Sequence, residues 1–321
     1  GRRRGHGRGV RTASVVNVVV LSGGVGGARF VRGLVDAVDP AGVTVVGNVG
    51  DDLEVLGLHV SPDLDSILYA LADLNDEGRG WGRAGETWNA LESVADLGGE
   101  AWFKLGDRDL GLHLVRTQWL REGEPLSAIT RRLAGALGIE ATILPATDDR
   151  LRTFVHTDAG ELSFQDWFVR RGHRDEVTGV RFEGAETARP APGVLEALAE
   201  ADLIVIAPSN PFVSIGPVLA VQEVRDAITN RHVPSVAVSP LIAGRAVKGP
   251  ADRMLSRLAG GTTPLQVTSC YKGLIDALVY DEADGEVELP VRSIVTRTLM
   301  SDADSRRRLA EAALEAAAAL R

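Results

Sequence analysis

The side chains best placed for chemistry are two pairs of acids in the first quarter of the chain. Asp51 and Asp52 directly follow a short apolar run at 43–46, and Asp63 and Asp65 come shortly after them. Magnesium is usually held by one or two carboxylates together with substrate phosphates. We therefore expect Asp51 and Asp65, from adjacent loops, to bind Mg²⁺. The alternative is that these acids are simply solvated, in a loop and a helix cap.

Helical geometry separates Asp63 from Asp65. Ser61 suits an N-cap and Pro62 a first helical turn, so both acids lie at a helix start. Residues two apart point about 200° apart around a helix. We expect both acids to face one ligand only if the helix begins irregularly. A carboxylate in the first turn is favourable on dipole grounds alone, which is the ordinary explanation for Asp63, although it stays a candidate for ligand binding.

A glycine-rich segment follows the apolar run at 18–21. Its candidate ligand-binding residues are Gly23, Gly24, Gly26 and Gly27. Backbone N–H groups at a glycine-rich helix start approach phosphates closely, and the helix dipole favours the negative charge. The segment is not a Walker A motif, and Arg29 stands where a dinucleotide fingerprint has its third glycine. We expect a phosphate or diphosphate ligand here; the alternative is a tight turn that binds nothing.

Two later loops carry polar side chains at the ends of apolar runs. Ser209 and Asn210 are bracketed by prolines in the segment 207–217, and Arg245 and Lys248 lie in 239–249. A rigid polar loop beside two basic residues suits a nucleotide with its phosphates. No nucleophile elbow, zinc-protease or kinase signature is present.

Charges are also concentrated at 106–109, where Arg108 stands between two aspartates. His113 and Arg116 follow on the expected helix. Arg108 is a candidate for binding an anionic or polar substrate group. The alternative is a surface ion pair, and spacing alone does not separate the two.

These segments follow runs of β-branched residues typical of buried parallel strands. We expect such strands at 18–21, 43–46, 203–207 and 235–238, and helices at 26–38, from 61, at 112–120, at 126–137 and from about 302. Strand–helix–strand units are parallel, and ligands bind outside the carboxyl ends of their strands. The fold class is therefore α/β: a doubly wound, mostly parallel, Rossmann-like sheet, with a helix-rich insertion covering the carboxyl-end rim.

We expect one α/β domain over 15–321, in which 80–190 is a mainly helical insertion. Short strands are expected within that insertion at 142–144, 153–156 and 162–169. The segment 1–14 holds five arginines and no acid, which is typical of a disordered basic leader.

Composition excludes several classes of function. The net charge of −9 opposes general nucleic-acid binding, and no run reaches the roughly 18 to 20 apolar residues that span a membrane. A single cysteine excludes an internal disulfide and a zinc ribbon, so we expect a cytoplasmic setting. We also expect a homodimer.

Taken together, the motifs resemble the 2-phospho-L-lactate transferases and phosphoenolpyruvate transferases of coenzyme F420 biosynthesis. The matching segments are SGGVGGARF (22–30), NVGDD (48–52), SPDLDSILY (61–69), GRGWG (78–82), ETWNA (86–90), KLGDRDLGLHLVR (104–116), ILPATDD (143–149), FQDWFVR (164–170), APSNPFVSIGP (207–217) and SPLIAGRAVKGPAD (239–252). They cover most of 18–280 in order, and the basic leader lies outside them.

The resemblance implies magnesium-dependent transfer of a phosphoenolpyruvyl or 2-phospholactyl group. The donor is a guanosine diphospho compound, the acceptor is the ribityl hydroxyl of the deazaflavin Fo, and GMP leaves. The product is dehydro-F420-0 or F420-0. The form of the glycine segment resembles the bacterial, enolpyruvyl-transferring branch of the family.

The resemblance also implies residue roles. Asp51 and Asp65 are similar to carboxylates on the magnesium and acceptor side, and Asp65 is the candidate proton acceptor. Arg108 is similar to a deazaflavin contact. The glycine segment, Ser209 and Asn210 are similar to the cradle of the guanylyl donor.

Two other functions remain open at this point. A nicotinamide-dependent oxidoreductase would use the same glycine segment, with Asp51 on the ribose, but it leaves the second acid pair unexplained. A non-catalytic regulator would bind guanine nucleotides and turn over nothing.

Overall fold

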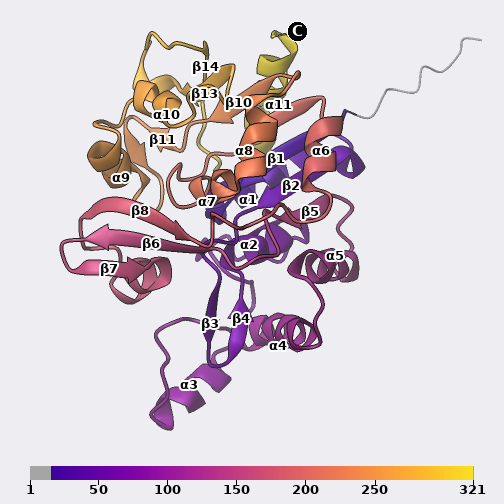
Figure 1. Cartoon of the computed structure of the whole chain (residues 1–321), viewed down its shortest axis with the longest axis vertical. Coiled ribbons are helices and arrows are strands. Elements are labelled where there is room, and N and C mark those ends of the chain that lie inside the picture. The colour runs from indigo at the N-terminus through magenta and orange to yellow at the C-terminus, as the bar shows by residue number, and fades with distance from the viewer. Residues whose placement is uncertain (1–15, 321) are drawn as a thin grey trace, which may run out of the picture.

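A seven-stranded parallel sheet forms the centre of the computed structural model, which describes residues 16–320 (Figure 1). The expected basic leader therefore lies outside the described residues. The strands of this sheet are β1 (Val18–Ser22), β2 (Val43–Gly47), β5 (Thr142–Pro145), β9 (Leu203–Ile206), β10 (Ser235–Val238), β13 (Ala277–Asp281) and β14 (Arg292–Thr296). Their order is β14-β13-β10-β9-β1-β2-β5, and every pairing is parallel. The predicted α/β fold class is confirmed.

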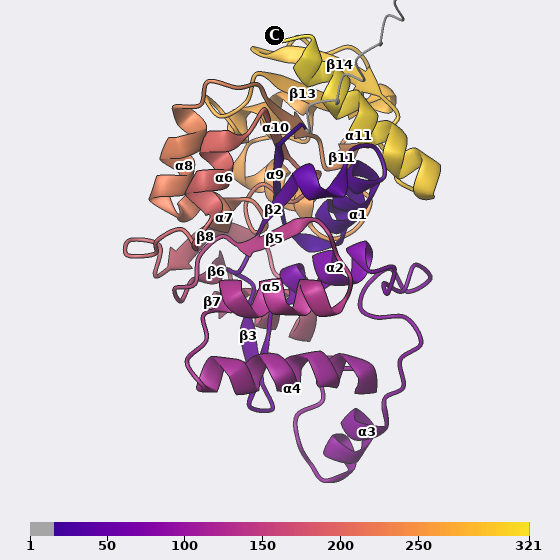
Figure 2. The same cartoon turned by 90° about the vertical axis from the view of Figure 1, so that its right-hand side faces the viewer.

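Helices cover both faces of the sheet, as Figure 2 shows edge-on. One side carries α1 (Gly24–Val35), α2 (Pro62–Leu71) and α11 (Ala303–Ala318), and the other carries α6 (Val194–Glu200), α7 (Gly216–Ala220) and α8 (Gln222–Thr229). Helix α1 packs against α11 at Gly33, where a side chain would collide with the backbone of Arg306. The remaining helices near the sheet are α5 (Leu126–Ala136), α9 (Ala251–Leu258) and α10 (Pro264–Cys270).

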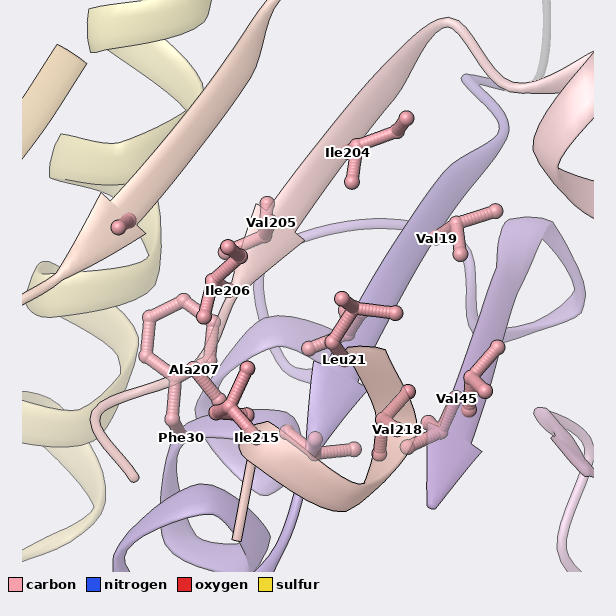
Figure 3. Packing of buried hydrophobic residues seen from close by; sticks show 14 of the residues in the cluster. Val19, Leu21, Phe30, Val45, Ile204, Val205, Ile206, Ala207, Ile215 and Val218 are labelled. Carbon is pink, nitrogen blue, oxygen red and sulfur yellow. The ribbon is translucent and has the colours of Figure 1, made fainter. Parts of the chain in front are cut away.

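Because both faces are covered, consecutive residues of the strands are buried. All five residues of β1 and all four of β9 are inaccessible, unlike the alternating pattern of a half-exposed sheet. Figure 3 shows Leu21 of β1 and Ile206 of β9, two neighbouring strands, close to Ile215 and Val218. Complete burial of such a side chain contributes about 1.5 to 3 kcal/mol, so the sheet forms the rigid base of the molecule.

The segment 80–190 is mixed, which corrects the prediction of a mainly helical insertion. Helices α3 (Asn89–Asp96) and α4 (Asp107–Arg121) precede α5, but β5 belongs to the central sheet. Strands β6 (Arg152–Thr157), β7 (Gly160–Ser163) and β8 (Val177–Glu183) then form a separate antiparallel sheet in the order β7-β6-β8. The expected strand at 162–169 ends early and gives way to a π-helical turn at Asp166–Arg170.

Several smaller elements complete the fold. The hairpin of β3 (Leu53–Val55) and β4 (Leu58–Val60) lies with α3 and α4 at the end of the molecule away from the sheet (Figure 1). Strands β11 (Leu241–Ile242) and β12 (Arg245–Ala246) form a second short hairpin. In the part of the chain that the structure describes, no helix combines the length and apolar character needed to cross a membrane.

The strand order reverses between β1 and β9. From β1 the chain adds β2 and then β5 on one side, and it returns to place β9 on the other. Ligands of such sheets bind in the crevice at this reversal, outside the carboxyl ends of the strands. The glycine segment follows β1 and the Ser209–Asn210 loop follows β9, so the reversal brings these two predicted segments together.

Candidate functional site

A cavity of about 780 Å³ opens at the carboxyl ends of the central strands. This volume is within the range of roughly 300 to 1,000 Å³ typical of small-molecule sites. Its walls come from the glycine segment, α2, the start of α4, the π-helical turn and the loops after β9 and β10. Among the residues predicted for ligand binding, the cavity is lined by Gly23, Gly24, Gly26, Asp51, Asp63, Asp65, Ser209, Asn210 and Lys248.

The glycine segment forms the start of α1, two residues earlier than the sequence predicts. Gly23 is the N-cap residue, and since glycine has no side chain, no side-chain hydrogen bond caps the helix. Gly24 has a φ of 67°, a conformation that favours glycine. A Cβ at Gly26 would lie 2.7 Å from the carbonyl oxygen of Pro208. These glycines therefore let the two loops approach each other while leaving backbone N–H groups at the cavity.

Ser209 joins the two halves of this cradle. Its Oγ donates a hydrogen bond of 2.7 Å to the carbonyl oxygen of Gly23 and accepts a longer one from the Gly23 N–H. The Asn210 Oδ1 accepts from the backbone N–H of Phe212, and its Nδ2 contacts the Met254 sulfur at 3.3 Å. Both side chains thus fix the shape of the loop that they place on the cavity wall.

Asp51 and Asp63 form a buried pair of carboxylates on the cavity wall. Burial, followed by the charge of Asp63, raises the pKa of Asp51 well above its usual value. Burial raises the pKa of Asp63 to about 6, although hydrogen bonds from Asn48 and the Gly24 N–H oppose this. Among the described residues, the Oδ1 atom of Asp51 is buried without a hydrogen-bond partner.

Asn48 holds this corner together, and the sequence analysis did not single it out. Its Nδ2 donates to Asp63 Oδ2 at 2.8 Å and to the Val213 carbonyl oxygen at 3.2 Å, and its Oδ1 accepts from the Gly50 N–H. Its position directly after β2 was the available signal, because that position faces the same rim as the predicted acids.

Asp65 points to a different element from Asp63, as helical geometry requires. Both of its carboxylate oxygens accept hydrogen bonds from the guanidinium of Arg116, which is fully buried on α4. The cavity nevertheless reaches Asp63 and Asp65, although α2 begins regularly at Pro62. Because both oxygens of Asp65 are taken by Arg116, the expectation that the two acids do not face one ligand stays a prediction.

Ser61 and Asp52 have structural roles beside the site. Ser61 is the predicted N-cap of α2, but its side chain does not cap the helix. Its Oγ instead donates to Asp52 Oδ2 at 2.8 Å, and His59 Nε2 lies 3.0 Å from the same oxygen.

Three predicted site residues do not line the cavity. Gly27 packs beneath it, where a Cβ would collide with the hydroxyl groups of Ser22 and Ser209. The backbone N–H of Arg108 is bonded to Glu86, and Arg245 is an exposed residue of β12. Motif spacing located these segments correctly, but it does not tell which way a side chain points.

Lys248 lies on the cavity wall and also joins two distant segments. Its Nζ is 3.4 Å from the carbonyl oxygen of Arg79 and 3.3 Å from that of Gly80. Trp81, next in the chain, is 44% exposed and also lines the cavity. The guanidinium of Arg79 lies between Trp81 and Trp88, 5.1 and 5.2 Å from their ring centroids.

Aromatic rings from the segment 164–173 form another part of the cavity wall, and Gln165 in the same segment donates to the Asp51 carbonyl oxygen at 2.9 Å. Phe164 and Phe168 stack with ring centroids 5.2 Å apart, and Phe168 stacks at 5.2 Å on His173. All three rings line the cavity. These rings were not predicted for the site, because a strand was expected at 162–169. The density of aromatic residues in FQDWF (164–168) was a usable signal.

No group of three or more His, Cys, Asp or Glu side chains within 16–320 is arranged to enclose a metal ion. A magnesium ion needs fewer protein ligands, since phosphates and water complete its octahedron. The orphaned oxygen of Asp51 beside Asp63 fits such a partial site.

Comparison with known proteins agrees with the family resemblance that the motifs indicate. The family model described as 2-phospho-L-lactate transferase CofD matches residues 18–317. A phosphoenolpyruvate transferase of Streptomyces griseus is 43% identical over 317 residues, covering 95% of this chain and 100% of the relative. That of Thermobifida fusca is 41% identical, covering 95% and 99%.

A solved structure supports the fold alone. A protein of the UPF0052 family from Bacillus halodurans aligns with a TM-score of 0.62 and 18% sequence identity, covering 93% of this chain and 99% of its own. The family match identifies the chain as a transferase, which removes the oxidoreductase and the non-catalytic regulator as alternatives. The chain belongs to the CofD family, whose model is described as 2-phospho-L-lactate transferase.

Proposed function

We propose that this enzyme acts in coenzyme F420 biosynthesis and transfers a phosphoenolpyruvyl group from a guanosine diphospho donor to the ribityl hydroxyl of the deazaflavin Fo. GMP leaves and dehydro-F420-0 forms; a 2-phospholactyl group would give F420-0. The observation that carries the proposal is one cavity, in a chain of this family, that joins a glycine-rich helix start to a buried carboxylate pair and an aromatic wall.

The donor end is assigned to the glycine segment and the Ser209–Asn210 loop. Backbone N–H groups at the start of α1 orient the diphosphate and stabilise the charge that develops on departing GMP. Lys248 and Arg29 add positive charge to the cavity wall. Transfer between phosphoesters needs placement and charge neutralisation more than covalent catalysis, and these groups supply both.

We assign Mg²⁺ to Asp51 and Asp63, in place of the pair Asp51 and Asp65 predicted from the sequence. Asp51 Oδ1 lacks a partner, whereas both oxygens of Asp65 are taken by Arg116. When bound, the ion neutralises charge on the transferred phosphate. Asp63 also accepts from the Gly24 N–H, so it connects the cation site to the donor cradle.

The acceptor end is assigned to the aromatic side of the cavity. Phe164, Phe168 and His173 present flat apolar faces, which suit a tricyclic deazaflavin ring by offset stacking. Trp81 lies on the same cavity and offers a second flat face.

Product analysis tests this proposal. The purified protein is incubated with Fo, MgCl₂ and either the enolpyruvyl or the lactyl guanosine diphospho donor, and the products are identified by mass spectrometry. We expect dehydro-F420-0 with an equal amount of GMP from the enolpyruvyl donor, at a higher rate than F420-0 from the lactyl donor. Absence of both products would overturn the proposal.

A homodimer and a cytoplasmic location are proposed as well. Light scattering on the purified protein should give twice the chain mass of 34.0 kDa. A mass equal to one chain would contradict the dimer.

A further inference from the structure

Helices α2 and α4 meet through polar side chains along the cavity. On this seam Arg116 takes both oxygens of Asp65, and Nη1 of Arg116 lies 3.0 Å from Asp65 Oδ2. Arg116 has no exposed surface and the Asp65 side chain is 6% exposed. Both oxygens of Asp65 are already occupied by the buried guanidinium, so neither is available to a substrate hydroxyl. Asp65 therefore holds the two helices together.

Asp109 is the other carboxylate of this seam, and it is held differently. Its Oδ1 accepts a short hydrogen bond from the Tyr69 hydroxyl, and His113 Nε2 lies 3.4 Å from the same atom. The Oδ2 atom makes no hydrogen bond within the described residues, and it is not among their buried unpartnered atoms. Asp109, Tyr69 and His113 all line the cavity. One oxygen is thus fixed and the other is free to meet a ligand.

The surroundings keep Asp109 ionised. Burial alone would raise its pKa, but the adjacent His113 ring and the Tyr69 hydroxyl lower it below the usual value. Tyr69 stays protonated because burial and the charges of Asp65 and Asp109 raise its own pKa. Asp109, bonded to Tyr69 through Oδ1, therefore offers a charged Oδ2 atom in a fixed orientation.

We propose that Asp109 is a catalytic residue that orients the acceptor hydroxyl and takes its proton through Oδ2. This inference rests on the proposed function. The acceptor oxygen forms a bond to the phosphorus that carries the three-carbon group, and the bond from that phosphorus to the GMP oxygen breaks with its electron pair. The hydroxyl proton passes to Asp109, and GMP leaves as the anion. An aspartate plays this part in protein kinases, where it accepts the proton of the substrate hydroxyl.

Tyr69 and His113 are positioning residues in this scheme. The Tyr69 hydroxyl holds Oδ1 by a hydrogen bond, and the His113 ring packs 3.4 Å from the same atom, which leaves Oδ2 for a ligand. Neither replaces the carboxylate, because Tyr69 donates its proton and the Nε2 atom of His113 is buried without a hydrogen-bond partner among residues 16–320. Loss of the Tyr69 hydroxyl should reduce kcat less than loss of the Asp109 charge.

The test compares Asp109→Asn with the wild-type enzyme in the Fo transfer assay. Asparagine keeps the shape but is not basic, so kcat should fall by about 10² or more, the usual contribution of a positioned acid or base. The KM values for donor and acceptor should stay within about threefold, because ground-state binding is unchanged. Glu122→Gln, an exposed acid at the C-cap of the same helix, is the matched control and should behave as wild type.

A second pair of variants decides the question if Asp109→Asn folds poorly. Asp109→Glu and Asp109→Gln add the same length and differ in charge alone. The proposal requires the Glu variant to be at least tenfold faster than the Gln variant, and equal rates would overturn it. Asp109→Asn with more than half of the wild-type kcat would overturn it as well. Failure of the proposed function is distinct, because the wild-type enzyme itself would then form no product.

Discussion

Two carboxylates that share a buried corner repel each other unless a cation lies between them. Burial raises the pKa of both Asp51 and Asp63, and each is sensitive to the charge of neighbouring acids. Asn48 stabilises Asp63 with a hydrogen bond of 2.8 Å, but nothing in residues 16–320 bonds to Asp51 Oδ1. At the residue scale, this unbalanced charge is the strongest argument for a divalent cation.

Asp51→Asn and Asp63→Asn should each reduce transfer and raise the magnesium concentration needed for half-maximal rate. The increase should be about tenfold or more, since loss of even an outer partner of a metal ligand costs that much and each change removes a direct ligand. The measurement is initial rate against MgCl₂ at saturating donor and acceptor. Asp96→Asn, at an exposed position of α3, is the control and should leave the curve unchanged. An unchanged magnesium requirement in both site variants would show that the ion binds elsewhere.

At the residue scale, most of the residues predicted for the site line one cavity, and their roles in it stay predictions. Asp51, Asp63, Asp65, Ser209 and Lys248 all line the cavity, because each follows the carboxyl end of a strand or starts the helix after it. The spacing of residues could not predict the direction in which a side chain points. Arg116, not Arg108, is buried on α4, because of the way this helix packs against α2. No local sequence pattern contains that information.

At the scale of elements, helix contacts decide where the site residues stand. Helix α1 carries the glycine segment, and its distance from α11 is set at Gly33, beside the Arg306 backbone. Helix α4 carries Asp109 and is tied to α2 through Arg116 and Tyr69. Two helix pairs thus hold residues of the cavity wall in place: α1 and α11 through close packing, and α2 and α4 through hydrogen bonds and an ion pair.

Gly33→Ala should destabilise the fold by about 1 to 3 kcal/mol, the usual cost of an overpacked contact. Its Cβ would collide with backbone that cannot rotate away. Gly111→Ala in α4 is the matched control, since a Cβ there meets nothing within 4 Å, and it should stabilise by about 1 kcal/mol through helix propensity. Urea unfolding followed by circular dichroism measures both, and equal effects would contradict the packing argument.

Arg116→Met should destabilise by about 3 to 5 kcal/mol, because it leaves the Asp65 carboxylate buried without a partner. Asp65→Asn combined with Arg116→Met should cost less than the sum of the two single changes, since the neutral amide no longer needs the guanidinium. Urea unfolding midpoints of the wild type, the two single variants and the double variant give the double-mutant cycle. Additive losses would mean that the two side chains do not interact in solution.

The positions of some strands could be predicted from the sequence and those of others could not. Strands β1, β2, β9 and β10 are continuous apolar runs, and the sequence located each within a residue or so. Strand β14 is an edge strand with mostly exposed or half-buried residues, so it gave no apolar run. In the small sheet, β6 agrees with the strand predicted at 153–156 and β7 overlaps the one predicted at 162–169. Strand β8 was not predicted, because most of its residues are only half-buried or exposed and its place depends on pairing with β6.

For the whole molecule, bound ligands should add to the stability of the fold. A ligand at a hundred times its Kd stabilises the native state by about 2.7 kcal/mol. GDP with MgCl₂ should therefore raise the midpoint of thermal unfolding by several degrees, and GDP with EDTA by much less, because the diphosphate then faces two uncompensated carboxylates. Scanning calorimetry measures the shift. An equal shift in EDTA would exclude a shared site for the nucleotide and the ion.

The bond between Ser209 and Gly23 joins residues that lie 186 positions apart in the chain. During synthesis, the N-terminal half of the nucleotide cradle therefore emerges long before its counterpart. A nascent chain that stops short of β9 has the first helix start and both acids, yet no second wall to close around a phosphate. Binding of a phosphate ligand therefore requires that these two distant parts of the chain have already folded together.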